Sequence, residues 1–128
     1  SGKVILSTEV LTLLRDGLTP KGDVLAAARI AAIMGAKATP GIIPLCHPIA
    51  LHGVEVEFLI TGGGVEITVE VKTADRTGVE MEALTAVSVA ALTIVDMVKA
   101  IDPMAVITDI SLQSKSGGKN GNWQRMQP

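Results

Sequence analysis

The fold is decided by the stretch Gly53-Val-Glu-Val-Glu-Phe-Leu-Ile60, Thr61-Gly-Gly-Gly64 and Val65-Glu-Ile-Thr-Val-Glu-Val-Lys72. In the first and third pieces apolar residues alternate with polar ones, which is the period of a β-strand that buries one face. The glycines between them are typical of a turn that reverses the chain. We therefore predict an antiparallel hairpin with a solvated outer face that carries Glu55, Glu57, Glu66 and Glu70.

Helices and short strands flank this hairpin. Capping residues and glycines predict helices over residues 8–15 and 24 to about 37, and Thr39-Pro-Gly41 is expected to end the second one. Residues 78–101 predict a long helix, and residues 3–6 and 105–114 predict strands. The order β-α-α-β-β-α-β is typical of an α+β domain whose helices pack on one face of an antiparallel sheet.

Composition excludes several classes of protein. The chain has 128 residues, of which 48% are hydrophobic and 19% charged, so we expect one folded domain rather than a disordered chain. A net charge of −2 and 2% aromatic residues argue against nucleic-acid partners. The longest nearly uncharged run, residues 83–95, is shorter than the ~20 residues of a membrane span, and a single cysteine suits a reducing compartment. We expect a cytoplasmic protein without a membrane partner.

The long predicted helix is apolar nearly all round. Between residues 83 and 95 its only polar side chains are Thr85, Ser88 and Thr93. Such a helix is buried on several sides, and its own sheet covers only one of them. The remaining sides belong either to the core or to an interface with a second copy of the chain. Because nearly half the residues of this small domain are apolar, we expect a homo-oligomer.

Ionisable residues stand at the two ends of this helix. Glu80 and Glu82 lie at its start, and Asp96 and Lys99 lie near its end. Glu82 and Asp96 are ~21 Å apart along the axis, so one chain cannot bring both to one reacting centre. Two copies packed antiparallel would place the start of one helix beside the end of the other. Helix-dipole stabilisation and an i,i+3 ion pair explain the same residues without any function.

Two loops carry further candidates. Prolines 44 and 48 predict a stiff, extended loop around Cys46 and His47. Neighbouring side chains on an extended chain point apart, so this pair is not a nucleophilic dyad, and His47 either binds a substrate or is a surface histidine. One cysteine and two histidines without ligand spacing predict no metal site.

The segment Lys115-Ser-Gly-Gly-Lys119 offers ammonium groups and accessible backbone N–H groups to an anion. It lacks the spacing of a phosphate-binding P-loop. The alternative is that residues 115–128 form a flexible, glycine-rich basic tail. Lys21 is a similar candidate, because it lies beside a glycine in the turn before a helix. Asp23 is expected to cap that helix.

Several of these segments occur in one characteristic order, which covers nearly the whole chain. They are Lys21-Gly-Asp-Val24, Ala28-Arg-Ile-Ala31, Ile43-Pro-Leu-Cys-His-Pro48, Thr77-Gly-Val-Glu-Met-Glu-Ala-Leu-Thr-Ala86, Ala90-Ala-Leu-Thr-Ile94, Asp96-Met97 and Lys115-Ser-Gly-Gly-Lys119. In this order they resemble the molybdenum cofactor biosynthesis protein C family, the cyclic pyranopterin monophosphate synthases.

The resemblance implies a ferredoxin-like subunit and dimers that assemble into a hexamer, a trimer of dimers, with active sites at the dimer interface. Residues 1–128 are then one catalytic domain that starts at the first strand, without the N-terminal arm of the family. The implied reaction converts 3′,8-cyclo-7,8-dihydro-GTP to cyclic pyranopterin monophosphate and releases pyrophosphate. It needs ring opening and reclosure by proton transfers, and an attack on the α-phosphate. No redox cofactor is consumed, and Mg²⁺ at most accompanies the triphosphate.

The resemblance also assigns roles to residues. Asp96 would be the catalytic carboxylate, and Lys21 and Lys99 would be ammonium groups that move protons or stabilise charge. The expected substrate-binding residues are Leu45, Cys46, His47, Glu80, Met81, Glu82, Lys115 and Lys119. Two alternatives stay open: a ferredoxin-like regulatory module that binds a small ligand without chemistry, and an oligomer with only a structural role.

Overall fold

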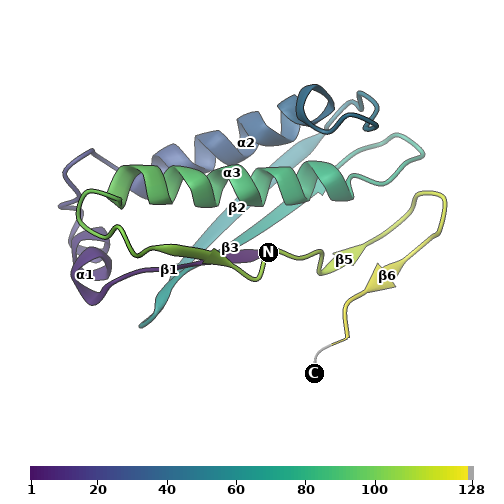
Figure 1. Cartoon of the computed structure of the whole chain (residues 1–128). Helices are drawn as coiled ribbons and strands as arrows, with labels where there is room; N and C mark the ends of the chain where they lie inside the picture. The colour runs from purple at the N-terminus through teal and green to yellow at the C-terminus, as the bar shows by residue number, and fades with distance from the viewer. Residues whose placement is uncertain (127–128) are drawn as a thin grey trace.

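The computed structural model describes residues 1–126, and its elements follow the predicted order. They are β1 (Gly2–Ile5), α1 (Thr8–Asp16), α2 (Val24–Ile42), β2 (Gly53–Ile60), β3 (Gly64–Lys72), α3 (Glu80–Val98), β4 (Val106–Thr108), β5 (Ser114–Lys115) and β6 (Trp123–Gln124). The four longer strands form an antiparallel sheet in the order β2-β3-β1-β4. Helices α2 and α3 lie side by side on one face of it (Figure 1). The predicted α+β fold, ferredoxin-like in its strand order, is confirmed.

The central hairpin forms in the predicted register. Val56 pairs with Val69 and Phe58 with Ile67, so the apolar residues of both strands share the face that the helices cover. The acidic row on the opposite face is exposed, as predicted. In the turn, the Thr61 hydroxyl accepts hydrogen bonds from the backbone N–H groups of Gly63 and Gly64. A side chain at Gly64 would collide with the Val4 carbonyl on β1, so only glycine lets these two strands pair.

The core lies between the sheet and the two long helices. Ala86, Ala90 and Ile94 of α3 are fully buried there, and Gly35 of α2 lets the helices approach until a Cβ at that position would collide with Val89. By length and composition alone, α3 would qualify as a membrane span. Its apolar residues form the centre of the protein core, which accounts for the same composition.

Helix α2 is longer than predicted. It continues through Thr39-Pro-Gly41 and ends at Ile42, with Pro40 inside its last turn. The prediction that this tripeptide ends the helix was wrong: Pro40 has no N–H to donate to the Ala36 carbonyl, but the helix continues past this missing bond to Ile42. The Thr39 hydroxyl donates to the Gly35 carbonyl, and the Ile43 N–H donates to the Thr39 carbonyl, so the backbone is held across the proline. The extra turn delivers the chain to the following loop.

The C-terminal part of the chain also differs from the prediction. The strand expected over residues 105–114 stops at Thr108, because Asp109 takes a left-handed conformation with φ 59°. The predicted flexible tail forms a small hairpin of β5 and β6, which projects from the body beside the start of α3 (Figure 1). The Arg125 N–H donates to the Gln113 carbonyl and closes this hairpin. The last two residues of that predicted tail, 127 and 128, lie outside the described residues.

Candidate functional site

The predicted site residues gather in two groups at opposite ends of α3 (Figure 1). We call the first the Glu80 cluster, which consists of Cys46, Glu80, Glu82 and Lys115. We call the second the Asp96 cluster, which consists of Lys21, Asp96 and Lys99. Glu82 and Asp96 are 14 positions apart on the helix, about 21 Å along its axis, so the two clusters do not meet within one chain.

The Asp96 cluster is an exposed acid with two ammonium groups. The Lys99 ammonium donates to Asp96 Oδ1 at 2.7 Å, one helical turn away. Lys21 comes from the turn before α2, where the Thr19 hydroxyl donates to the Gly22 carbonyl and fixes the loop. The hydrogen bond and charge of Lys99 hold the pKa of Asp96 below its ordinary value, and the charge of Lys21 acts in the same direction. Asp96 and Lys99 are therefore in direct contact, and Lys21 is near enough for its charge to act on Asp96.

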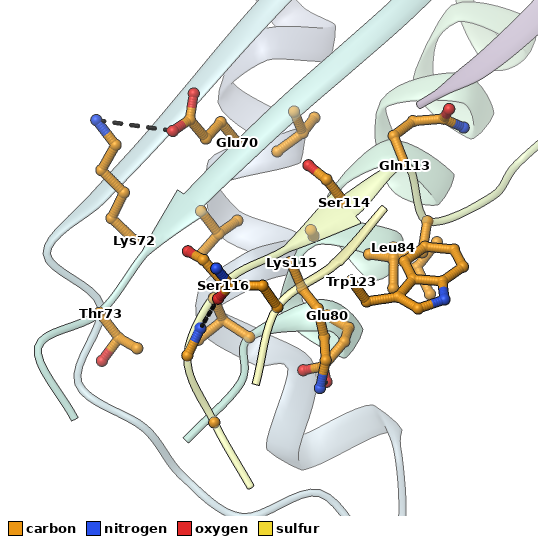
Figure 2. A pocket seen from close by; sticks show the side chains of 18 of the residues that line it. Glu70, Lys72, Thr73, Glu80, Leu84, Gln113, Ser114, Lys115, Ser116 and Trp123 are labelled. Atoms are coloured by element: carbon orange, nitrogen blue, oxygen red, sulfur yellow. Dashed lines mark hydrogen bonds and ion pairs between the residues drawn. The ribbon is translucent and has the colours of Figure 1, made fainter. Parts of the chain in front are cut away.

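Glu80 and Lys115 form the more exposed half of the Glu80 cluster. The Lys115 ammonium donates to Glu80 Oε1 at 3.1 Å, and the two side chains are 18% and 31% exposed (Figure 2). A hydrogen bond from the backbone N–H of Glu80 itself holds the pKa of this carboxyl below its ordinary value, and Lys115 adds to that effect. The ion pair ties the C-terminal hairpin to the first turn of α3. Lys115 therefore belongs to an ordered strand and not to a flexible tail.

Cys46 and Glu82 form the buried half. Glu82 is only 2% exposed, and the Cys46 thiol donates to its Oε2 at 3.5 Å. Burial raises the pKa of the Cys46 thiol, and the charge of Glu82 raises it further. The thiol is therefore protonated near neutral pH and acts as a hydrogen-bond donor to a buried carboxylate, not as a nucleophile. Glu82 also lies in the first turn of α3, where the helix dipole favours its negative charge.

Two clefts border the Glu80 cluster, and Glu80 lines both of them. The smaller one, about 500 Å³, lies between the loop before β2 and the start of α3. Leu45, His47 and Met81, three of the predicted substrate-binding residues, line it. The larger one, about 1010 Å³, runs under the C-terminal hairpin and contains Lys115 (Figure 2). Lys119 lies in the turn of that hairpin and lines neither cleft.

Other residues of these clefts were not predicted from the sequence. Asp75 lines both clefts, and Trp123 and Asn122 line the larger one. Asp75 could have been predicted, because it is an acidic residue in the loop that leads to the long helix. Trp123 is the single tryptophan of the chain, but the prediction of a flexible tail gave no reason to place it in a cleft.

The geometry suits proton transfer and the binding of a charged substrate. Each cluster pairs a carboxylate with an ammonium group, so each can donate and accept protons in a neighbouring ligand. Within residues 1–126, no three His, Cys, Asp or Glu side chains are grouped so that they could hold a metal ion. The prediction of no protein-bound metal site stays a prediction.

Comparison with known proteins gives a consistent result. The model of the MoaC family matches residues 1–118. A protein of Streptomyces griseus subsp. griseus named cyclic pyranopterin monophosphate synthase is 64% identical over 128 residues, which are 100% of this chain and 72% of the relative. A protein of the same name from a Nocardioides species is 59% identical, over 98% of this chain and 78% of the relative.

Cyclic pyranopterin monophosphate synthase 2 of Mycobacterium tuberculosis is 55% identical over 125 residues, which are 98% of this chain and 75% of the relative. Family model and relatives thus cover the sheet, both long helices and both clusters. The chain belongs to the MoaC family.

Proposed function

We propose that this chain is a cyclic pyranopterin monophosphate synthase of molybdenum cofactor biosynthesis. The observation that carries the proposal is the 64% identity, over the whole chain, to a relative of that name. The reaction is that of a lyase: it rearranges 3′,8-cyclo-7,8-dihydro-GTP to cyclic pyranopterin monophosphate and releases pyrophosphate. The two clusters described above supply the acids and bases that such a rearrangement needs.

We propose further that two protomers complete each site. The Glu80 cluster of one protomer would face the Asp96 cluster of its partner, with the two α3 helices antiparallel. The helix layer supports this arrangement because its outer face is apolar: Ile30 and Met34 of α2 are 60% and 64% exposed, and Leu92 of α3 is 58% exposed. Three such dimers would form the hexamer.

The roles follow from the chemistry of each cluster. Asp96 is the catalytic carboxylate, held ionised by Lys99, and Lys21 and Lys99 move protons or stabilise developing negative charge. Glu80 and Glu82 accept hydrogen bonds from the amino and ring N–H groups of the guanine-derived base. Lys115 binds the phosphates, and Lys119 adds charge from the hairpin turn.

The proposed reaction uses no redox cofactor, and Mg²⁺ enters only with the triphosphate of the substrate. The proposed compartment is the cytoplasm, which suits a chain with a single cysteine. Chelation by EDTA should therefore alter the KM for the substrate while the unfolding temperature of the protein stays unchanged. A fall in the unfolding temperature on chelation would instead indicate a metal ion held by the protein.

Replacement of the proposed catalytic acid tests the function. Asp96→Ala should lower pyrophosphate release from the cyclised nucleotide by at least ~10²-fold, because the reaction loses its acid–base group. Asp96 is exposed, so the variant should unfold at the wild-type temperature. Glu57→Ala, which removes an exposed carboxylate on the outer face of the sheet, is the matched control and should retain full turnover.

Turnover of the Asp96→Ala variant within tenfold of wild type would remove Asp96 from catalysis. A wild-type protein that binds the nucleotide but releases no pyrophosphate would favour the regulatory binding module over the enzyme.

A further inference from the structure

Hydrogen bonds join two loops beside the smaller cleft, which Asp75 lines. We call this set the loop latch; it consists of Ala50, His52, Thr73, Ala74 and Asp75. The Ala74 N–H donates to His52 Nδ1 at 3.0 Å, and the Ala50 N–H donates to Asp75 Oδ2 at 3.3 Å. The Thr73 hydroxyl donates to the Ala50 carbonyl at 2.7 Å. The N–H and the carbonyl of Ala50 are thus both hydrogen-bonded. Contact between the two chain segments therefore continues beyond the paired ends of β2 and β3.

The two loops joined by the latch carry the Glu80 cluster and its cleft. One loop runs from the end of α2 to β2 and presents Leu45, Cys46 and His47. The other runs from β3 to α3 and ends at Glu80. The Cys46 N–H donates to the Ile43 carbonyl, and the Cys46 thiol donates to Glu82. From there to Ala50, no backbone hydrogen bond within residues 1–126 holds the first loop. The position of His47 therefore depends on Cys46 on one side and on the latch on the other.

The imidazole of His52 has one defined role in this latch. A backbone N–H can only donate, so His52 Nδ1 is the acceptor of the Ala74 hydrogen bond. His52 lines neither cleft. A substitution there removes no contact with a bound ligand, so any effect on binding must pass through the loops.

We propose that His52 is a positioning residue: by accepting the Ala74 N–H, it fixes the His47 loop against the start of α3 and so sets the shape of the substrate cleft. This inference rests on the proposed function for its kinetic test only. The occupant of the cleft is the nucleotide base, and the latch supplies no group to the reaction. The expected defect is therefore in substrate binding and not in the chemical step.

The test compares two substitutions of the same residue. His52→Leu removes the acceptor, whereas His52→Asn keeps an acceptor oxygen at the same distance from the backbone as Nδ1. His52→Leu should raise the KM about 5- to 10-fold, the range expected for the loss of one hydrogen bond, with kcat within about twofold. His52→Asn should restore the KM to within about twofold of wild type. Because His52 is exposed, both variants should unfold within ~2 °C of wild type.

A second measurement does not depend on the reaction. Cys46 is the single cysteine and lies on the same loop, so its rate of alkylation by iodoacetamide reports how firmly the loop is held. His52→Leu should increase this rate several-fold, and His52→Asn should not.

An unchanged KM and alkylation rate in His52→Leu would overturn the proposal, and so would an Asn variant as impaired as the Leu variant. If wild-type protein showed no turnover, the proposed function would fail, and the alkylation rates alone would decide whether the latch holds the loop.

Discussion

Two inactive variants should restore each other's activity if two protomers share each site. The perturbations are Asp96→Ala, which disables one cluster, and Glu82→Gln, which disables the other. When either variant is present alone, one of the two clusters is defective in every site. In a mixed dimer with two-fold symmetry, both defects fall in one of the two sites, and the other site receives two intact halves.

The magnitude follows from the length of α3. Because Glu82 and Asp96 lie about 21 Å apart in one chain, an intact site must take one cluster from each protomer. Random mixing of equal amounts gives half mixed dimers, so about 25% of all sites should be intact and activity should recover to about a quarter of wild type. Asp96→Ala alone should show at most ~1% of wild-type activity. Glu82→Gln alone should fall well below the activity of the mixture, because one carboxylate acceptor becomes an amide donor.

The assay is pyrophosphate release after the two variants are co-expressed with different tags and the doubly tagged species is purified. Doubly tagged hexamers should show about a quarter of the wild-type turnover, because about half of their dimers are mixed and each mixed dimer has one intact site. The control is Asp96→Ala mixed with Lys99→Ala: both defects lie in the same cluster, so no site becomes intact. Activity of the doubly tagged species no greater than that of its parents would refute the shared site.

Three further predictions concern single positions. Gly35→Ala would stabilise an isolated helix, but here the added methyl collides with Val89, so thermal unfolding should show a loss of ~1–3 kcal/mol. Glu82→Gln removes a charge that raises the pKa of the Cys46 thiol, so iodoacetamide should alkylate this thiol faster at pH 8, and an unchanged rate would contradict the contact. The pKa of Glu80 is lowered in the folded state, so its contribution to stability is full above its ordinary value of 4.5 and is lost as pH falls through the lowered value. The difference in unfolding temperature between wild type and Glu80→Gln should therefore shrink from pH 7 to pH 3.

The sheet and the long helices could be predicted because their signals are local. The alternation through β2 and β3 indicates which face is buried, and the structure confirms the hairpin. Pro40 misled the prediction because the loss of one backbone hydrogen bond does not by itself end a helix, and the bonds that Thr39 makes across the proline cannot be read from the tripeptide. The end of β4 depends on the left-handed conformation of Asp109, and an aspartate in a β-rich run gives little sign of it.

The site could be predicted only in part, for a related reason. The motif residues around Glu80 and Asp96 were found from their order along the chain, and the structure brings each group together. The contact between Lys115 and Glu80 required a hairpin that composition did not indicate, since its strands are only two residues long. The loop latch left no sequence signal either, because two of its residues use only their backbone groups and the others are common loop residues.

The composition of α3 explains why a shared site suits this fold. One side of its middle turns is buried against the sheet and α2, where an unpaired charge would be costly, and the outward side is apolar, with Leu92 58% exposed. Residues 83–95 carry no ionisable side chain, so the charged groups of the helix stand in its end turns. Glu82 lies in the first turn and is buried. The helix N-terminus and the Cys46 thiol stabilise its charge there. A helix that must be apolar in the middle therefore separates its charged groups by its own length. Antiparallel pairing with a second copy would bring them back to one reacting centre without placing any charge in the core.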